Sequence, residues 1–289
     1  MKKTSTVLCV ALLTGLIACD DHRTPPEAVS TCPVVKRTLL FPSPSLPYVE
    51  TVNYNNVAYN LGLNDYQTFT YDEQGRVSQS ETVFSVNPQQ ANSKSTYEYS
   101  PTQIKETRYA SNGTSSQINY SLNNQGLIAS GNGSTYQYDN NGYLVKSTSA
   151  TTERTYTITN GNLVEQVEVV KTPAATTTRI SQYEYDQSKP GFTAALQQPY
   201  YLIEPGYQAI APYFGKNTRN LLTKSTTSIA TVLKDGTPFK SNSVATFIYT
   251  YDQRGQIIRT KSVINNTIDE PLYRDENITV NDFTYGCAL

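Results

Sequence analysis

The chain has 289 residues, a formal net charge of −1 at pH 7 and only 16% charged residues. Because it lacks a basic excess, it has no electrostatic basis for binding nucleic acid. Tyrosine is abundant at 23 residues, while tryptophan is absent and the initiator is the only methionine. This usage is typical of an exported, strand-rich protein, and the length suits one large all-β domain or two small ones.

Residues 1–18 predict a lipoprotein signal peptide. A positively charged start precedes an apolar run, Val7 to Ile17, which is too short and too close to the start for a typical membrane span. The run ends in Leu16-Ile17-Ala18-Cys19, which resembles a bacterial lipobox and implies lipidation of Cys19. Two or three acyl chains there would hold the protein stably on a membrane. The alternative is an ordinary signal peptide with a chance cysteine.

Acidic residues follow the lipobox at Asp20 and Asp21. In this position they resemble the surface-export signal of Bacteroidetes lipoproteins, whereas in enterobacteria an aspartate there resembles an inner-membrane retention signal. We favour the first, which predicts a lipid-anchored protein exposed on the bacterial outer membrane. Residues 19–35 contain three prolines and little apolar periodicity, so we interpret them as a lipidated tether to a single domain, residues 36–289.

Two cysteines remain for the mature domain, Cys32 near its start and Cys287 near its end. In an oxidising compartment such a pair is a candidate disulfide, which would join the first ordered residues to the last strand. Two buried free thiols are the alternative. A metal site needs more ligands than these two residues offer, so we expect no metal.

A nine-residue phrase recurs at residues 69–77, 136–144 and 249–257: aromatic, any, Tyr, Asp, two polar residues, Gly, any, aliphatic. Residues two apart in a strand share a face, so the aromatic residue and the Tyr lie side by side. The Asp accepts hydrogen bonds from the backbone ahead of it, and the Gly closes a type I turn with a bulge. Each copy therefore predicts a β-hairpin, with a structural rather than catalytic Asp. The turn-forming residues are Asp72, Gly75, Asp139, Gly142, Asp252 and Gly255.

Weaker copies lie between the clear ones, for example at residues 118–128 and 156–167. Where the copies are clean, successive turns are roughly 20 residues apart, which is the length of one two-stranded unit. Hairpins joined in series predict an all-β antiparallel meander. We expect a curled or partly closed sheet, because a flat one would expose its edges.

The phrases Tyr71-Asp72-Glu73-Gln74-Gly75, Tyr138-Asp139-Asn140-Asn141-Gly142 and Tyr251-Asp252-Gln253-Arg254-Gly255 resemble the YD repeats of RHS-type proteins. With the lipobox and the acidic start, the layout is similar to the uncharacterised YD-repeat-like lipoproteins of Bacteroidetes, the DUF4595-type group. The resemblance covers about residues 50 to 287 and implies a β-sheet surface protein without an established activity. The chain departs from RHS proteins in being too short for their large encapsulating shell or a toxin domain.

The repeat pattern is interrupted at about residues 187–220 by a segment rich in proline and aromatic residues. One interpretation is that it plugs the end of the sheet and buries its aromatic rings. The other is that it forms part of a ligand platform, because aromatic rings offer a rigid apolar face with a polar edge to a sugar or a partner strand. The candidate platform residues are Tyr200, Tyr201, Tyr207, Tyr213 and Phe214.

The only histidine, His22, lies in the predicted tether, so a Ser-His-Asp or Cys-His site is not expected. There is no Gly-rich phosphate loop and no cofactor motif. We therefore predict a non-enzymatic surface lipoprotein that binds glycan or protein and touches the membrane through its lipid. The alternatives are a periplasm-facing lipoprotein in envelope assembly and, with less support, a glycosidase built on two carboxylates.

Overall fold

The computed structural model describes residues 32–85, 93–191, 208–268 and 274–287. These described residues form 17 β-strands and one short 3₁₀ helix, η2 (Gln208–Phe214). The first strands are β1 (Val34–Pro42), β2 (Tyr48–Tyr54), β3 (Val57–Tyr71), β4 (Val77–Phe84), β5 (Ser93–Ser100), β6 (Gln103–Tyr109), β7 (Ser115–Leu122), β8 (Ile128–Gly131) and β9 (Ser134–Tyr138). The later strands are β10 (Leu144–Thr148), β11 (Thr152–Thr159), β12 (Asn162–Lys171), β13 (Ala175–Pro190), β14 (Asn220–Leu233), β15 (Pro238–Tyr251), β16 (Ile257–Ile268) and β17 (Arg274–Tyr285).

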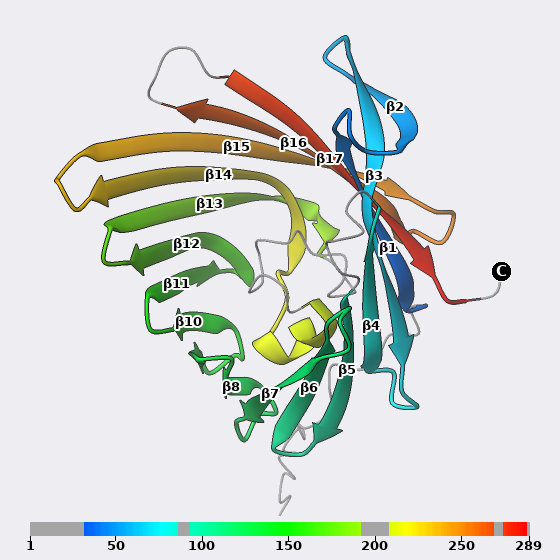
Figure 1. Ribbon diagram of the computed structural model, residues 1–289, viewed down its shortest axis with the longest axis vertical. Helices are drawn as coiled ribbons and strands as arrows, with labels where there is room; N and C mark the ends of the chain where they lie inside the picture. Colours follow the sequence, from blue (N-terminus) through cyan, green and yellow to red (C-terminus); the bar gives the residue numbers. More distant parts are fainter. Residues whose placement is uncertain (1–31, 86–92, 192–207, 269–273, 288–289) are drawn as a thin grey trace, which may run out of the picture.

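The predicted antiparallel meander is confirmed, but the sheet is closed rather than curled or partly closed. From β3 to β17 each strand pairs antiparallel with the next, and β1 then lies between β17 and β3. In the described part of the chain, β1 and β3–β17 thus form a barrel of 16 strands (Figure 1). The closing strand is the first in the sequence, and hairpin phrases alone do not encode its two partners.

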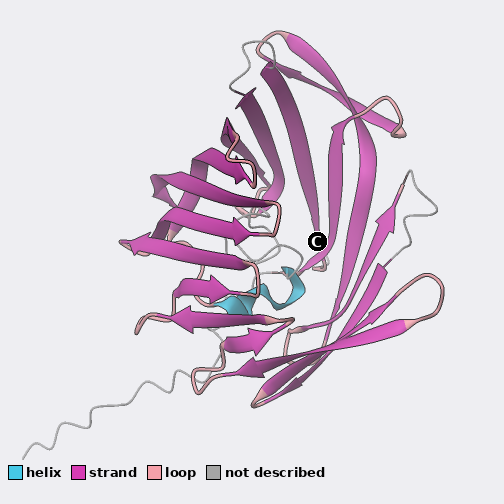
Figure 2. Cartoon of the chain, turned by 60° about the vertical axis from the view of Figure 1, so that its left-hand side comes forward, coloured by secondary structure: helices cyan, strands magenta, loops and turns pink. Residues whose placement is uncertain are grey.

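The helix η2 lies inside the barrel, between opposite parts of the wall (Figure 2). Ala209 packs with interior residues that include Phe69 and Phe283, from strands β3 and β17. Ile210 and Phe214 pack with a second interior cluster from strands β6 to β9. The helix therefore joins two hydrophobic clusters across the interior, which agrees with the interpretation of the interruption as a plug. The strand before the interruption is also longer than expected: β13 continues to Pro190, whereas the sequence pattern predicts that the interruption begins at about residue 187.

The two faces of strand β11 differ in polarity. On β11, Arg154, Tyr156 and Ile158 are half-buried and face the interior, whereas the threonines between them and Glu153 are exposed. The same alternation places Tyr183 and Phe247 in an interior cluster with Leu222. The outward face of β11 is thus a polar surface suited to contact with water.

The repeated tyrosine has a role beyond packing. Near the end of six strands, a tyrosine hydroxyl donates to the carbonyl of a residue at or near the start of the neighbouring strand, with O···O distances of 2.6 to 2.7 Å. Burial raises the pKa of these tyrosines where a shift is resolved, so the hydroxyls remain donors. The pairs are Tyr71–Val34, Tyr99–Val77, Tyr138–Ile128, Tyr185–Leu163, Tyr249–Leu222 and Tyr285–Ile257.

The third copy of the phrase is shifted relative to the others. Its sequence suggests that Tyr249 and Tyr251 form the buried pair, but Tyr251 is 40% exposed. The buried aromatic residue is instead Phe247, and Tyr249 supplies the bridging hydroxyl. A β-bulge lies between Thr250 and Tyr251, but the first copy has the same bulge between Thr70 and Tyr71, so the bulge does not explain the shift.

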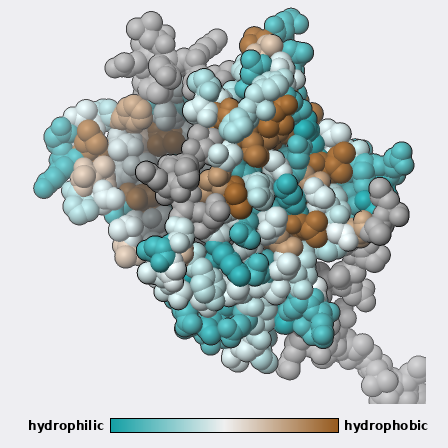
Figure 3. Space-filling view, turned by 45° about the vertical axis from the view of Figure 1, so that its right-hand side comes forward, coloured by the Kyte–Doolittle hydropathy of each residue, from teal (hydrophilic) through white to brown (hydrophobic). Residues whose placement is uncertain are grey.

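A second core lies on the outside of the barrel. Phe283 faces the interior, so Ile278 and Val280, at odd-numbered separations from it, face outwards. They pack with Leu40 and Val263, and the ribbon formed by β2 and the first half of β3 covers them with Leu61 and other residues. Figure 3 shows this side, with apolar side chains grouped among polar ones.

Two charged contacts hold the same ribbon on the wall. The Nη1 atom of Arg259 on β16 lies 2.9 Å from a carboxylate oxygen of Glu50 on β2. The ammonium of Lys261 lies 5.3 Å from the centre of the Tyr54 ring. The ribbon is therefore fixed to the barrel by apolar packing, an ion pair and a cation–π contact.

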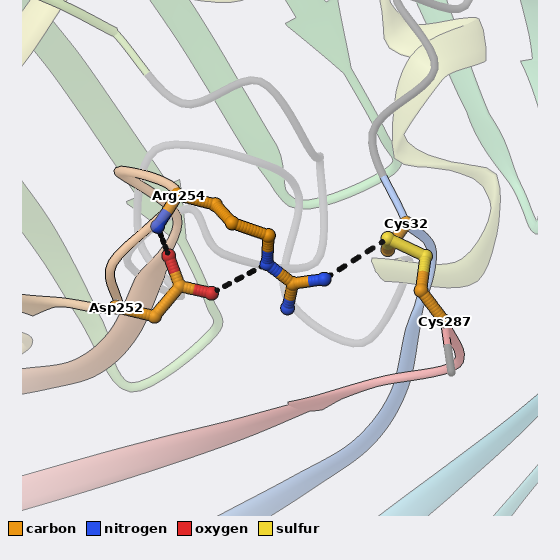
Figure 4. The surroundings of a disulfide bond; sticks show 4 residues. All are labelled: Cys32, Asp252, Arg254 and Cys287. Carbon is orange, nitrogen blue, oxygen red and sulfur yellow. Dashed lines mark hydrogen bonds and ion pairs between the residues drawn. A yellow bond between two sulfur atoms is a disulfide. The ribbon is translucent and has the colours of Figure 1, made fainter. Parts of the chain in front are cut away.

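The predicted disulfide between Cys32 and Cys287 is present, with a Cα–Cα distance of 5.3 Å. It joins the residues before β1 to the end of β17, next to the backbone bond from the Gly286 amide to the Pro33 carbonyl. Arg254 donates to Cys32 Sγ at 3.7 Å and is itself held by Asp252 (Figure 4). The strand that closes the barrel is thus covalently tied to its neighbour.

Candidate functional site

A half-open hollow lies inside the barrel, at the ends of β10 to β12, where residues 215–218 pass after η2. The space around it, open solvent included, is about 520 Å³, of which about 50 Å³ can hold the centre of a water molecule. We call it the Tyr143 hollow. Its lining residues are Tyr143, Leu144, Tyr156, Ile158, Gly161, Leu163, Ala211, Phe214, Gly215, Lys216, Asn217 and Thr218.

Backbone contacts hold residues 215–219 across the turns between the strands. The Lys216 amide donates to the Gly142 carbonyl at 2.9 Å, and the Arg219 amide donates to the Gly161 carbonyl at 2.8 Å. Gly215 has a φ of +101°, and a Cβ there would lie 2.7 Å from the Gly142 carbonyl oxygen. Only glycine therefore allows this segment to approach the turn so closely.

Two buried asparagines fix the far end of the same segment. Asn162 Nδ2 donates to Asn220 Oδ1 at 3.0 Å, and the Asn220 amide donates back to Asn162 Oδ1 at 2.8 Å. Asn220 Nδ2 also donates to the carbonyl of Lys189 at 3.1 Å. Because these buried polar groups satisfy one another, the wall of the hollow is fixed before any ligand arrives.

The hollow combines an apolar floor with aromatic and polar groups. Ile158, Leu163 and Phe214 supply apolar surface, and Tyr143 and Tyr156 supply rings with polar edges. The ammonium of Lys216 lies 5.9 Å from the centre of the Tyr143 ring. Such a mixture suits a compact ligand with one apolar face and several hydroxyl groups.

Polar side chains continue from the hollow along the interior wall. The Tyr156 hydroxyl lies 3.3 Å from Ser147 Oγ. Two residues earlier on β11, Arg154 Nε donates to Glu168 at 2.6 Å, and Arg179 Nη1 donates to the other Glu168 oxygen at 2.7 Å. Glu168 is only 6% exposed. The two guanidinium groups neutralise its charge, as a buried carboxylate requires.

Two residues of the predicted platform lie in the interior. Phe214 is 5% exposed and packs edge-on against Tyr136, with 5.0 Å between ring centres. Tyr213 is half-buried and stacks on Tyr99 at 5.5 Å. Of these two, only Phe214 lines the hollow, so they do not form a shared exposed platform. Tyr200, Tyr201 and Tyr207 lie outside the described residues, as do the lipidation candidate Cys19 and the predicted signal segment.

The turn aspartates are occupied by their own turns. One oxygen of Asp72 accepts from the amides of Gln74 and Arg76, and Asp139 and Asp252 make the equivalent pairs of bonds. In the Asp72 turn, the salt bridge and hydrogen bonds to Arg76 lower the pKa of the carboxylate against the opposing effect of its partial burial. Gly75, Gly142 and Gly255 have φ values of +75°, +83° and +79°. These six residues form the hairpin turns, and none of them lines the hollow.

Other carboxylates buried in the described residues are also paired. Glu106 is 3% exposed and accepts from the Tyr120 hydroxyl at 2.8 Å and from Arg108 at 2.9 Å. Within the described ranges, no group of three or more His, Cys, Asp or Glu side chains could hold a metal ion. No helix in the described part of the chain is long and apolar enough to cross a membrane.

No protein-family model matches the chain, and no curated protein matches it. The chain is similar to a solved porin-like protein from Bacteroides uniformis, with a TM-score of 0.49 and 15% identity over 88% of this chain and 97% of that one. A porin-like protein from Bacteroides vulgatus gives a TM-score of 0.32 and 12% identity over 89% of this chain and 100% of that one. At these values neither protein carries a function over to this chain. The resemblance to YD-repeat lipoproteins stays a prediction.

Apart from Phe214, which is a candidate platform residue, sequence reasoning missed the residues of the hollow. Tyr143 follows directly after the turn glycine of its phrase, and Lys216 lies in the interruption, so neither repeats in the other clear copies. Departure from the repeat is the signal that could have found them. Their proximity depends on the path of residues 215–219, which no local pattern encodes.

Proposed function

We propose that the protein is a non-enzymatic, lipid-anchored binding module of the bacterial outer-membrane surface, and that the Tyr143 hollow binds a saccharide. The observation that carries the proposal is the hollow itself, in which Tyr143 and Tyr156 stand beside an apolar floor. A pyranose has apolar C–H faces and a polar rim, so an aromatic ring next to hydrogen-bonding groups is a suitable receptor for it.

Anchoring by lipid rather than by the barrel wall is supported by the outward face of β11. A strand that spans a bilayer in a barrel turns apolar side chains towards the lipid. On β11 the exposed side chains are threonines and Glu153, which favour water. The Leu16-Ile17-Ala18-Cys19 sequence supplies the attachment in this proposal.

Isothermal titration of the mature domain against a panel of neutral and acidic oligosaccharides tests the binding. Tyr143→Ala removes a ring from the hollow, and we expect affinity for the bound saccharide to fall about tenfold, the effect of losing an important contact residue. Tyr109→Ala is the matched control, because Tyr109 also has a lysine over its ring, Lys94 at 6.0 Å, but does not line the hollow. Equal losses in both variants, or no binding across the panel, would contradict the proposal.

Location is tested separately by adding protease to intact and lysed cells. Digestion in intact cells supports surface exposure, whereas protection that disappears on lysis supports the periplasm-facing alternative. Cys19→Ala is expected to release the protein in soluble form. A variant that remains in the membrane fraction would contradict the lipid anchor.

A further inference from the structure

We infer that the saccharide bound by the Tyr143 hollow is anionic and carries a carboxylate or a sulfate group. This inference rests on the proposed function and adds the charge of the ligand to it. The chain as a whole has a formal net charge of −1. Among the described residues that line the hollow, by contrast, Lys216 is the only charged side chain.

A second cation borders the same mouth. Arg219 is exposed, and its Cβ and Cδ lie 3.1 and 3.5 Å from the position that a Cβ on Gly161, a lining residue, would occupy. The turn that contains Gly142 has one carboxylate, that of Asp139, and its Oδ1 accepts from the amides of Asn141 and Tyr143. Two cations at a mouth lined without carboxylates favour an anion electrostatically.

The position of Lys216 fits a charged substituent on a ring. Its ammonium lies 5.9 Å from the centre of the Tyr143 ring, so a sugar that enters against this ring brings its substituents near the lysine. An ammonium binds a carboxylate or sulfate more strongly than a neutral hydroxyl, because both partners are charged. The lysine thus distinguishes an acidic sugar from a neutral sugar of the same shape.

The wall beyond Tyr156 offers another cationic group to a longer chain. Arg154, Glu168 and Arg179 together carry a net charge of +1, since both oxygens of the single carboxylate are bound by the two arginines. The Arg179 side chain is 45% exposed. Arg154 lies two residues from Tyr156 on β11, about 7 Å along the strand. An oligosaccharide with a charge on successive rings would therefore meet positive charge in both places.

The probes are trigalacturonic acid, its methyl ester and a sulfated chondroitin disaccharide, titrated calorimetrically into the mature domain at low salt. The ester has the same rings as the acid but no charge. We expect the wild-type protein to bind the acid or the sulfated sugar at least threefold more tightly than the ester. Raising the salt to 1 M, where the Debye length is about 3 Å, should remove most of this difference.

Charge reversal locates the effect. Lys216→Glu is expected to weaken binding of the anionic probe about tenfold and binding of the uncharged ester much less, because an exposed ion pair contributes little more than fivefold and the variant adds repulsion towards the anion alone. Lys94→Glu reverses another exposed lysine, the one over Tyr109, and should change binding of neither probe. Preference for the carboxylate or for the sulfate identifies the anionic group, and either preference supports the inference.

Different results would contradict the anionic ligand and the saccharide site itself. If the ester binds as tightly as both anionic probes, or if Lys216→Glu leaves anion binding unchanged, the anionic ligand is wrong while a saccharide site remains. If no probe and no member of the saccharide panel binds, both are wrong. A thermal unfolding curve of Lys216→Glu that matches the wild type shows that any loss of binding is local.

Discussion

Tyr185→Phe tests whether the tyrosine bridges stabilise the barrel. The Tyr185 hydroxyl donates to the Leu163 carbonyl at 2.6 Å, and Leu163 is 5% exposed. Phenylalanine keeps the buried ring and removes only the donor. A neutral hydrogen bond contributes about 1 kcal/mol net, and loss of a partner for a buried acceptor costs about 1 to 3 kcal/mol. We therefore expect the free energy of unfolding to fall by about 1 to 2 kcal/mol.

Urea unfolding followed by far-UV circular dichroism measures this change. The midpoint should fall while the slope m stays constant, because the surface exposed on unfolding is unchanged. Tyr48→Phe is the control. Tyr48 is 66% exposed and its hydroxyl contacts only Thr51 at 3.2 Å among the contacts described, so we expect a change within about 0.5 kcal/mol. Equal effects of the two substitutions would refute a stabilising role for the bridge.

A second bridge extends the same test. Tyr71 donates to the Val34 carbonyl and belongs to a different interior cluster from Tyr185. Losses at independent sites usually add within about 0.5 kcal/mol, so the double Tyr71→Phe, Tyr185→Phe variant should lose about 2 to 4 kcal/mol. Since a folded domain has only about 5 to 15 kcal/mol in total, six such bridges are a large share of the stability.

Burial, followed by the Glu106 carboxylate, raises the pKa of Tyr97 to about 12, and burial raises that of Tyr183 to about 12. Their contribution to stability is complete below the unfolded pKa of about 10 and is lost as the pH rises through 12, so an unfolding midpoint that is constant from pH 9 to 12 would contradict the shifts. Replacing Cys32 and Cys287 by serine opens a loop spanning 255 residues and should cost about 2 to 5 kcal/mol in oxidised samples, and an unchanged melting temperature would count against this role. Gly75→Ala should cost about 1 to 2 kcal/mol through its φ of +75° alone, because no atom lies within 4 Å of the new Cβ, and a neutral result in urea unfolding would contradict that cause.

The local units of the fold could be predicted from the sequence, because each depends on residues close together in the chain. The phrase beginning at Phe69 specifies a strand, an Asp-opened turn and a returning strand without any distant contact. The disulfide could also be predicted, since few cysteines remain after the predicted signal segment. In each case a short pattern or a simple count limits the alternatives.

The closed barrel and the hollow could not be predicted in the same way. Closure depends on β1, which pairs with β17 about 250 residues away and carries no clear copy of the phrase. The hollow depends on Gly215 and on the bond from Lys216 to Gly142, which lies 74 residues earlier in the chain. The sequence did not distinguish a buried plug from a ligand platform at Tyr213 and Phe214, because an exposed and a buried aromatic residue look alike in a sequence.

The pairing of β1 with β17 determines when the barrel can be completed. Val34 pairs with Tyr285, so β1 lacks this neighbour until nearly the whole chain has emerged. During synthesis, the growing sheet keeps unpaired edges at β1 and at its latest strand, and such edges can join other chains. Contacts this distant in sequence also form slowly. Truncation before β17 would therefore turn a closed barrel into an aggregation-prone open sheet.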